Sequence, residues 1–144
     1  MIFSKKITYG IKALLELVPL YPSGQMTVKE IAANHDISKK FLDHVLQLLN
    51  KNDIVRSKKG SLGGYYLNHS PGAIRLDEII KAIDGPILFA DCSTRDSDCK
   101  SKEDCQVYGL ILEAQQKLYE YLSSITLKEL YEKPLIKGAL DYSI

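Results

Sequence analysis

Aromatic residues and long apolar runs are scarce in this chain. It has no Trp and only three Phe among its 144 residues, although nine Tyr are present and 45% of the residues are hydrophobic. No apolar stretch approaches the roughly 18 residues that a membrane-spanning helix needs, and residues 1–6 lack the apolar core of a secretory signal. The sequence therefore predicts a soluble, cytoplasmic protein of one domain with an appendage.

Cysteine is equally scarce, and its three copies are clustered. Cys92, Cys99 and Cys105 fall within 14 residues of one another. An odd, clustered set in a cytosolic chain argues against a disulfide framework. Metal binding, thiol redox chemistry and coincidence remain as explanations.

The small net charge of +1 conceals an uneven distribution. Residues 1–66 contain 10 Lys and Arg against 5 Asp and Glu, whereas residues 67–144 contain 9 against 13. A basic front half suits a module that binds a polyanion, because each neutralised phosphate releases counterions. The sequence has no recognisable nucleophile–base pair, phosphate-binding loop or paired carboxylates in an apolar setting, so we do not expect an enzyme.

Three helices are predicted in the basic half. Ser4 is a good N-cap for the first, and apolar residues recur after it at helical spacing. Thr27 and Glu30 make a T-x-x-E capping box at the start of a short second helix. Ser38 caps a third helix with a clear apolar stripe. Two short helices joined by a tight connection fit helix-turn-helix geometry.

A glycine-rich hairpin follows these helices. A strand is predicted to begin at Ile54, and residues 58–64 form a turn whose glycines permit positive φ. The strand returns through residues 65–67, which completes a winged helix. Further helices are predicted over residues 77–84 and from residue 107 to about residue 123, with a last short one after Thr126. The fold class is therefore mainly α, a winged helix-turn-helix domain followed by a long C-terminal helix.

The third predicted helix is the candidate for reading DNA, because a recognition helix enters the major groove by its N-terminal residues. The candidate DNA-binding residues are Ser38, Lys39, Lys40, Asp43 and His44 on this helix, Lys58 and Lys59 at the hairpin tip, and Tyr9 on the first helix. Asp43 would accept from a cytosine amine, and the lysines would reach phosphates or base edges. Each residue alone is equally well explained as part of a solvated helix face, but the ordered set favours DNA binding.

Several separated motifs resemble the Rrf2 family of bacterial winged-helix transcription regulators. They are ISKKFLDH at 37–44, NDIV at 52–55, KGSLGGYYL at 59–67, IRLDEIIKAIDGPI at 74–87 and LYEYLSSITLKEL at 118–130. The resemblance runs from Ser4 to about Leu130 and keeps both order and spacing. It implies a transcription regulator, expected to be a repressor, that binds double-stranded DNA at a pseudo-palindromic operator.

The resemblance also implies a domain organisation. Residues 1–88 would form the DNA-binding domain, residues 89–106 a cysteine loop, and residues 107–144 a dimerisation helix and tail. The long helix would make a homodimer by crossing its counterpart. Two positions depart from the family pattern: Lys59 stands where Arg is common, and Lys40 stands where Ser is common in cluster-binding members. The operator sequence therefore does not carry over.

The cysteines match cluster-binding members of the family in place and nearly in spacing. The pattern Cys92-x6-Cys99-x5-Cys105 implies an iron–sulfur cluster on three thiolates, which are the usual cluster ligands. Two known fourth ligands of the family are absent: residues 106–108 contain no His, and Thr8 stands where other members have Asp. The fourth ligand and the choice between a two-iron and a four-iron cluster stay open, with Asp91, Glu103 and Asp104 as acidic candidates.

Other interpretations of the same residues remain. The thiols would serve as a redox switch without metal, given a low thiolate pKa, or as ligands of a structural zinc ion. The same fold would also sense a thiol metabolite or a partner protein. A winged-helix module that binds protein and never contacts DNA is the alternative from a different functional class.

Overall fold

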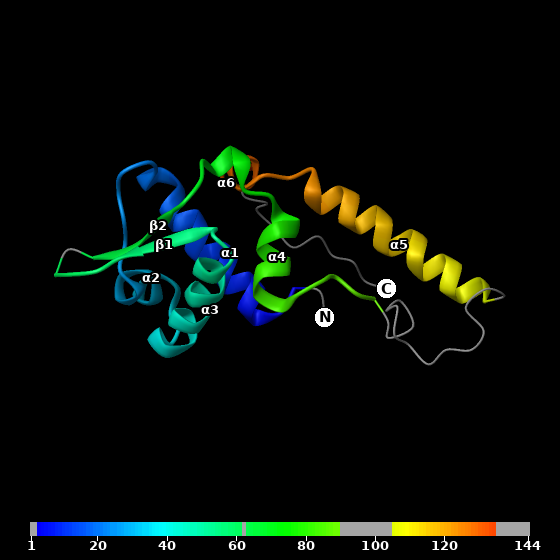
Figure 1. Cartoon of the computed structure of the whole chain (residues 1–144), viewed down its shortest axis with the longest axis horizontal. Helices are drawn as coiled ribbons and strands as arrows, with labels where there is room; N and C mark the ends of the chain where they lie inside the picture. The colour runs from blue at the N-terminus through cyan, green and yellow to red at the C-terminus, as the bar shows by residue number, and fades with distance from the viewer. Residues whose placement is uncertain (1–2, 62, 90–104, 135–144) are drawn as a thin grey trace.

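The computed structural model describes residues 3–61, 63–89 and 105–134. Along the chain its elements are α1 (Lys5–Leu17), η1 (Val18–Leu20), α2 (Val28–His35), α3 (Lys39–Lys51), β1 (Val55–Lys58), β2 (Gly64–Leu67), η2 (Pro71–Ala73), α4 (Leu76–Asp84), α5 (Gln106–Ser123) and α6 (Leu127–Glu132). Figure 1 shows a body of α1–α4 with the hairpin at one side and α5 at the other. The predicted mainly helical, winged-helix architecture is confirmed.

The helices begin where the sequence predicts N-caps. The Ser38 hydroxyl oxygen accepts from the backbone N–H of Phe41 at 3.1 Å. The capping box is complete, since Thr27 caps Glu30 and the Glu30 carboxylate accepts from the Thr27 backbone N–H at 2.8 Å. Hydrogen bonds from the Thr27 side chain and then its backbone lower the pKa of Glu30. Thr126 caps α6 in the same way. These local bonds satisfy donors that a helix start otherwise leaves unpaired.

The hydrophobic core lies where α1 packs against α3 and α4. Its largest fully buried side chains come from all three helices, with additions from α2, α6 and β1: Ile7, Leu14, Leu17, Ile31, Leu42, Val45, Leu46, Leu49, Val55, Ile79 and Leu127. Gly10 allows the close approach of α1, because a Cβ there would lie 2.5 Å from Cδ1 of Ile83. The packing of these helices positions α3 with its N-terminal end free.

The hairpin is a two-stranded antiparallel sheet in which Val55 pairs with Leu67 and Lys58 with Gly64. A bridge between Met26 and Tyr65 ties β2 to the segment before α2. Gly64 has φ of +151°, and a Cβ there would lie 2.6 Å from the Met26 carbonyl oxygen, so only glycine fits. The wing is thereby fixed to the helix-turn-helix.

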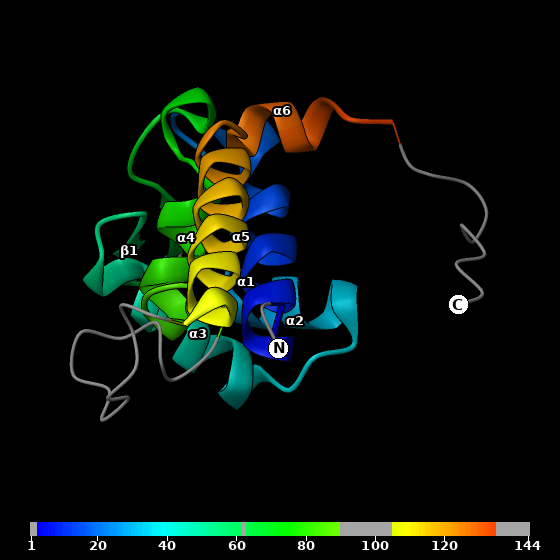
Figure 2. The same cartoon turned by 90° about the vertical axis from the view of Figure 1, so that its right-hand side faces the viewer.

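Helix α5 is attached to the body by its C-terminal end. The Leu76 N–H donates to the Ile125 carbonyl at 3.0 Å, and the Leu127 N–H donates to the Ile74 carbonyl at 2.8 Å. Helix α6 then returns against α1 and the two short 3-10 turns. Figure 2, viewed from the α5 side, shows α5 lying in front of α4 and α1 with α6 crossing above them. Within the described residues, no helix is both long and apolar enough to span a bilayer.

Candidate nucleic-acid interface and cysteine segment

The N-terminal end of α3 presents polar and basic side chains. Ser38, Lys39, Lys40 and His44 are all exposed there. The Ser38 oxygen is engaged as the helix cap, but its hydroxyl hydrogen remains available to donate. The first-turn N–H groups carry the positive end of the helix dipole, which favours a nearby anion. This end of α3 therefore combines charge and donors suited to a phosphate backbone or base edges.

Asp43 is held in a defined position on α3. Its carboxylate accepts from Nε2 of Gln47 at 2.8 Å, one helical turn further on. Burial, and then the negative charge of Asp43, raise the pKa of Tyr65 on the hairpin. Gln47, which orients Asp43, was not among the site residues predicted from the sequence. The four-residue spacing of the two side chains is the signal that would have found it.

Tyr9 connects α1 to the start of α3. Its ring meets Phe41 edge-on, with ring centroids 5.8 Å apart. Nζ of Lys12 lies over the same ring, 5.5 Å from its centroid. The aromatic contact fixes Tyr9 beside the candidate reading helix, while the cation above its face adds to the positive charge there.

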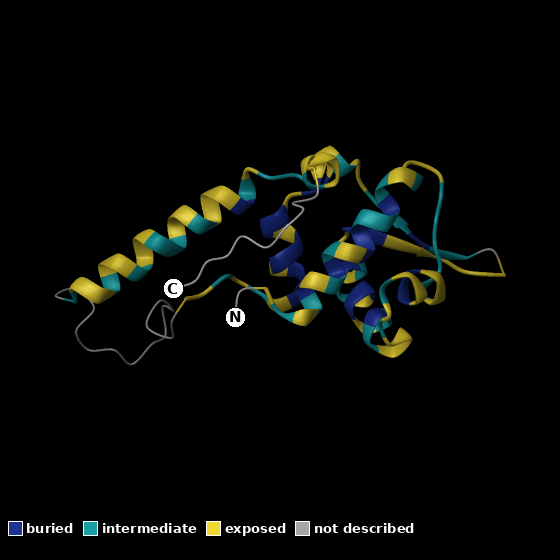
Figure 3. Cartoon of the chain, turned by 180° about the vertical axis from the view of Figure 1, so that it is seen from behind, coloured by how far each residue is buried: buried dark blue, intermediate teal, exposed yellow. Residues whose placement is uncertain are grey.

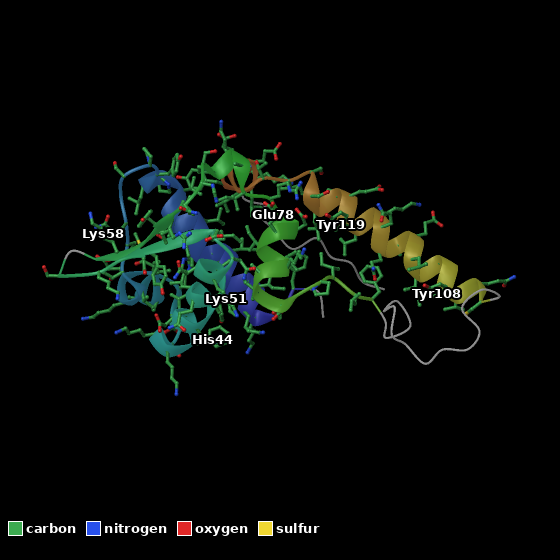
Figure 4. The ribbon with its side chains drawn as sticks, viewed as in Figure 1. His44, Lys51, Lys58, Glu78, Tyr108 and Tyr119 are labelled. Carbon is green, nitrogen blue, oxygen red and sulfur yellow. The ribbon has the colours of Figure 1, made fainter. Side chains whose placement is uncertain are left out.

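The wing carries the remaining candidates. Lys58 ends β1, Lys59 follows it in the turn, and both are exposed. Arg56 on the same strand forms an ion pair with Asp53 at 2.6 Å. Figure 4 places Lys58 on the hairpin and His44 on α3, both in the part of the molecule away from α5. The structure thus gathers the predicted DNA-binding residues on the winged helix.

Cys105 is the N-cap of α5. Its Sγ accepts from the backbone N–H of Tyr108 at 3.4 Å, and the residue is partly buried. Cys92 and Cys99 lie outside the described residues. In the described ranges, no group of three or more His, Cys, Asp or Glu is placed to hold a metal ion. Thr8 is exposed on α1. It stands at the position where the resemblance places an Asp cluster ligand in other family members.

An ion cluster joins the ends of α1 and α4. The Ser4 hydroxyl donates to Oδ2 of Asp84 at 2.5 Å, and Lys6 pairs with Oδ1 of the same residue. Burial raises the pKa of Asp84, but hydrogen bonds from Lys6 and Ser4 and the charge of Lys6 outweigh it and hold that pKa below its usual value. This cluster fixes the point from which the chain leaves α4 toward the cysteine segment.

Helix α5 exposes much of its apolar surface. Val107 is 62% exposed, Leu110 66% and Tyr121 58%, whereas Leu122 is 2% exposed. In Figure 3 the helix is mostly yellow and teal, in contrast to the dark blue of the body. Isolated exposed apolar residues are ordinary, but a contiguous patch on a single helix marks an interaction surface.

Comparison with known proteins identifies relatives along nearly the whole chain. The family described as "Rrf2: Iron-dependent Transcriptional regulator" matches residues 3–133. A putative HTH-type transcriptional regulator, rrf2-like, from Rhodobacter capsulatus is 33% identical over 135 residues, which is 88% of this chain and 90% of the relative.

Two solved structures share the fold. CymR (YrzC), the global cysteine regulator of B. subtilis, superposes with a TM-score of 0.72 at 29% identity, covering 89% of this chain and 94% of CymR. The IscR of T. potens superposes with a TM-score of 0.69 at 28% identity, covering 88% and 83%. These relatives are transcription regulators and not enzymes. The chain belongs to the Rrf2 family of winged-helix transcriptional regulators.

Proposed function

We propose that this regulator is a homodimeric repressor that reads a pseudo-palindromic operator with α3 and the wing, and whose operator affinity depends on an iron–sulfur cluster held by Cys92, Cys99 and Cys105. The observation that carries the proposal is the position of Cys105. It is a candidate cluster ligand and, at the same time, the N-cap of the helix whose apolar face is exposed. Cofactor site and dimer helix therefore share one residue.

The reading of DNA is assigned to exposed side chains of the winged helix. Lys39 and Lys40 are the first two residues of α3, directly after its N-cap, where the helix dipole adds to their positive charge. Lys58 and Lys59 at the hairpin supply a second point of contact. Asp43 is oriented by its hydrogen bond and suits a cytosine amine in the major groove. Phosphate contacts would set the register, and the α3 side chains would supply base selectivity.

Dimerisation is assigned to the outward face of α5. At 3.6 residues per turn, Val107, Leu110, Ala114 and Tyr121 fall on one side of the helix. Leu122 lies on the side that packs on the body. A helix that is apolar on both sides needs a second surface to cover the outer one. A second copy supplies an identical helix, and a two-fold dimer matches a pseudo-palindromic operator.

The described part of the cysteine segment suits a thiolate ligand. Cys105 Sγ accepts from a backbone N–H at the start of an 18-residue helix, where the helix dipole places partial positive charge beside the sulfur. When bound, an iron–sulfur cluster would supply a redox-active and ligand-sensitive iron centre at three thiolates. The residues of this chain would hold it through Cys105 at the start of α5 and through the two cysteines before it.

Coupling to DNA would run through this shared residue. Binding of a cluster to the Cys105 thiolate would change how well this residue caps α5. In a dimer, α5 would set the separation of the two recognition helices. A coupling free energy of about 1–3 kcal/mol between the cysteine site and the operator is enough for a useful switch.

The DNA-binding part is tested by selecting duplexes from a random pool and measuring affinity against salt concentration. Lys40→Ala should lower affinity severalfold and reduce the slope of log affinity against log salt by about one. Lys51→Ala, at the far end of the same helix, is the matched control and should bind as wild type does. A protein that selects no sequence and shows no salt-dependent retention on duplex DNA would be a protein-interaction module instead.

The cluster part is tested by anaerobic purification with iron and acid-labile sulfide analysis. Cys105→Ser and Cys105→Ala should both lose iron and sulfide, but Ser is a good N-cap and Ala is not, so only Cys105→Ala should also lose helix signal in circular dichroism. Wild-type protein that stays metal-free after reconstitution would contradict the cluster. Reversible thiol oxidation or a partner protein would then be the signal.

A further inference from the structure

A cavity lies between α4, α5 and the segment that connects them. Its volume is about 620 Å³, within the range typical of small-molecule sites. Its apolar wall is formed by Pro86, Ile87, Leu88, Leu112 and Tyr119. Figure 4 shows Tyr119 on α5 above the chain that follows α4. None of these residues belongs to the proposed DNA-binding or cluster-binding sets.

One polar residue of the cavity is a buried acid. The Asp77 side chain is 7% exposed, and it is the buried charged residue among those that the structure describes. Arg75 approaches from outside with contacts of 3.3 and 3.4 Å, and Oδ1 of Asp77 accepts no hydrogen bond in the described part of the chain. A buried carboxylate without short hydrogen bonds is costly, so a donor supplied by a ligand would improve its environment.

The polar lining of the cavity also includes a cation on α4, Lys81, and three residues of α5, Glu113, Gln115 and Gln116. Lys81 stands four residues after Asp77, hence on the same face of α4 and about 6 Å further along its axis. Lys81 is exposed, and its ammonium forms no ion pair with any residue whose position is described. A carboxylate and an ammonium one helical turn apart, next to an apolar wall, complement a small zwitterion that has an apolar side chain.

We infer that this cavity binds an α-amino acid with a hydrophobic side chain. The ligand ammonium pairs with Asp77, its carboxylate with Lys81, and its side chain lies against Ile87, Leu112 and Tyr119. Bound there, the ligand bridges α4 of the body to the middle of α5. The inference is independent of the proposed cluster and of the operator, because it rests on the α4–α5 cavity alone.

The cavity stays open when α5 pairs with a second helix on its outward face. Leu112 and Tyr119 line the open cavity and are themselves partly exposed, whereas the more exposed Leu110 and Tyr121 are assigned to the dimer. At 100° per residue these pairs point to different sides of the helix. A ligand site and a helix–helix interface can therefore coexist on α5.

The test is calorimetric titration of the full-length protein with L-leucine and L-phenylalanine as probes. We expect saturable binding of at least one, and at least tenfold weaker binding of leucinamide, which lacks the carboxylate, and of 4-methylpentanoic acid, which lacks the ammonium. Asp77→Asn and Lys81→Met should each weaken amino-acid binding at least tenfold. Lys51→Met, outside the cavity, is the matched control and should bind as wild type does.

Variant folding is monitored by circular dichroism, and Lys81→Met carries the test alone if Asp77→Asn does not fold, because Lys81 is on the surface. The inference is overturned if neither amino acid binds at millimolar concentration. It is also overturned if the amide or the acid binds as tightly as the amino acid, or if Lys81→Met binds as wild type does. None of these outcomes depends on DNA binding or iron content.

Discussion

Helices α4 and α5 face each other across the cavity, yet they are stabilised in opposite ways. Six of the nine residues of α4 are buried, including Leu76, Ile79 and Ile83. Only Leu122 is buried among the 18 residues of α5, all of which are described. Both helices are amphipathic, but the apolar side of α4 is covered within one chain and much of that of α5 is not.

This difference separates folding from assembly. A helix buried in its own chain contributes to the free energy of unfolding of that chain, because its apolar area leaves water on folding. A helix whose apolar face is exposed makes its contribution only when another surface covers it. Substitutions in α4 should therefore change stability, and substitutions on the outer face of α5 should change self-association.

The largest expected effect is in α4. Ile79→Ala removes a fully buried side chain and should lower the free energy of unfolding by about 2–5 kcal/mol, through lost burial and the cavity left behind. Urea unfolding monitored by circular dichroism measures it. A loss below about 1 kcal/mol would mean that α4 does not hold the body together.

A change on α5 should affect assembly instead. Leu110→Lys places a charge in the exposed apolar face and should weaken self-association at least tenfold while leaving the helix content unchanged. Sedimentation velocity over a range of concentrations measures this. Gln116→Lys, on the polar side of α5, is the control and should associate as wild type does. If Leu110→Lys associates as tightly as Gln116→Lys, this face of α5 is not part of the interface.

The smallest expected effect lies at the end of α4. The lowered pKa of Asp84 means that its ionised form is favoured by folding, so it stabilises the protein above about pH 3.8, the unfolded value, and this stabilisation is lost as pH falls through the folded pKa. Asp84→Asn should cost about 0.2–1 kcal/mol at neutral pH, as expected for a partly exposed ion pair.

Measuring the free energy of unfolding against pH tests this prediction. The stability curves of wild type and Asp84→Asn should converge as pH falls below 3.8. Asp53→Asn, which removes a more exposed carboxylate paired with Arg56, is the matched control. Parallel curves for wild type and Asp84→Asn would contradict the ion cluster.

Much of the fold could be predicted because its signals are local. Ser38 and Thr126 are N-caps whose bonds reach three residues ahead, so the sequence alone locates the helix starts. Long-range features were not predictable in this way. The bridge between Arg75 and Thr126 and the burial of Asp77 depend on where α5 and α6 return in space, which no short window of sequence encodes.

The candidate site, too, could be predicted from the sequence only in part. The sequence selects Lys39, Lys40 and the wing lysines by their order on a recognisable motif, and the structure places them exposed on the winged helix. The hydrogen bond from Gln47 to Asp43 was not predicted, although its four-residue spacing is visible in the sequence, and Cys105 was not predicted to cap α5 because Cys is not among the preferred N-cap residues. The roles of all these residues in binding remain predictions.

The central claim is that α5 is completed by a second copy and that the resulting dimer reads two half-sites. Sedimentation equilibrium of the wild-type protein, free and with its selected duplex, tests this most directly. The account predicts a species of twice the 16.2 kDa chain mass at micromolar concentration, and two chains per duplex. A monomer of 16.2 kDa that binds a half-site as tightly as the full site would contradict it.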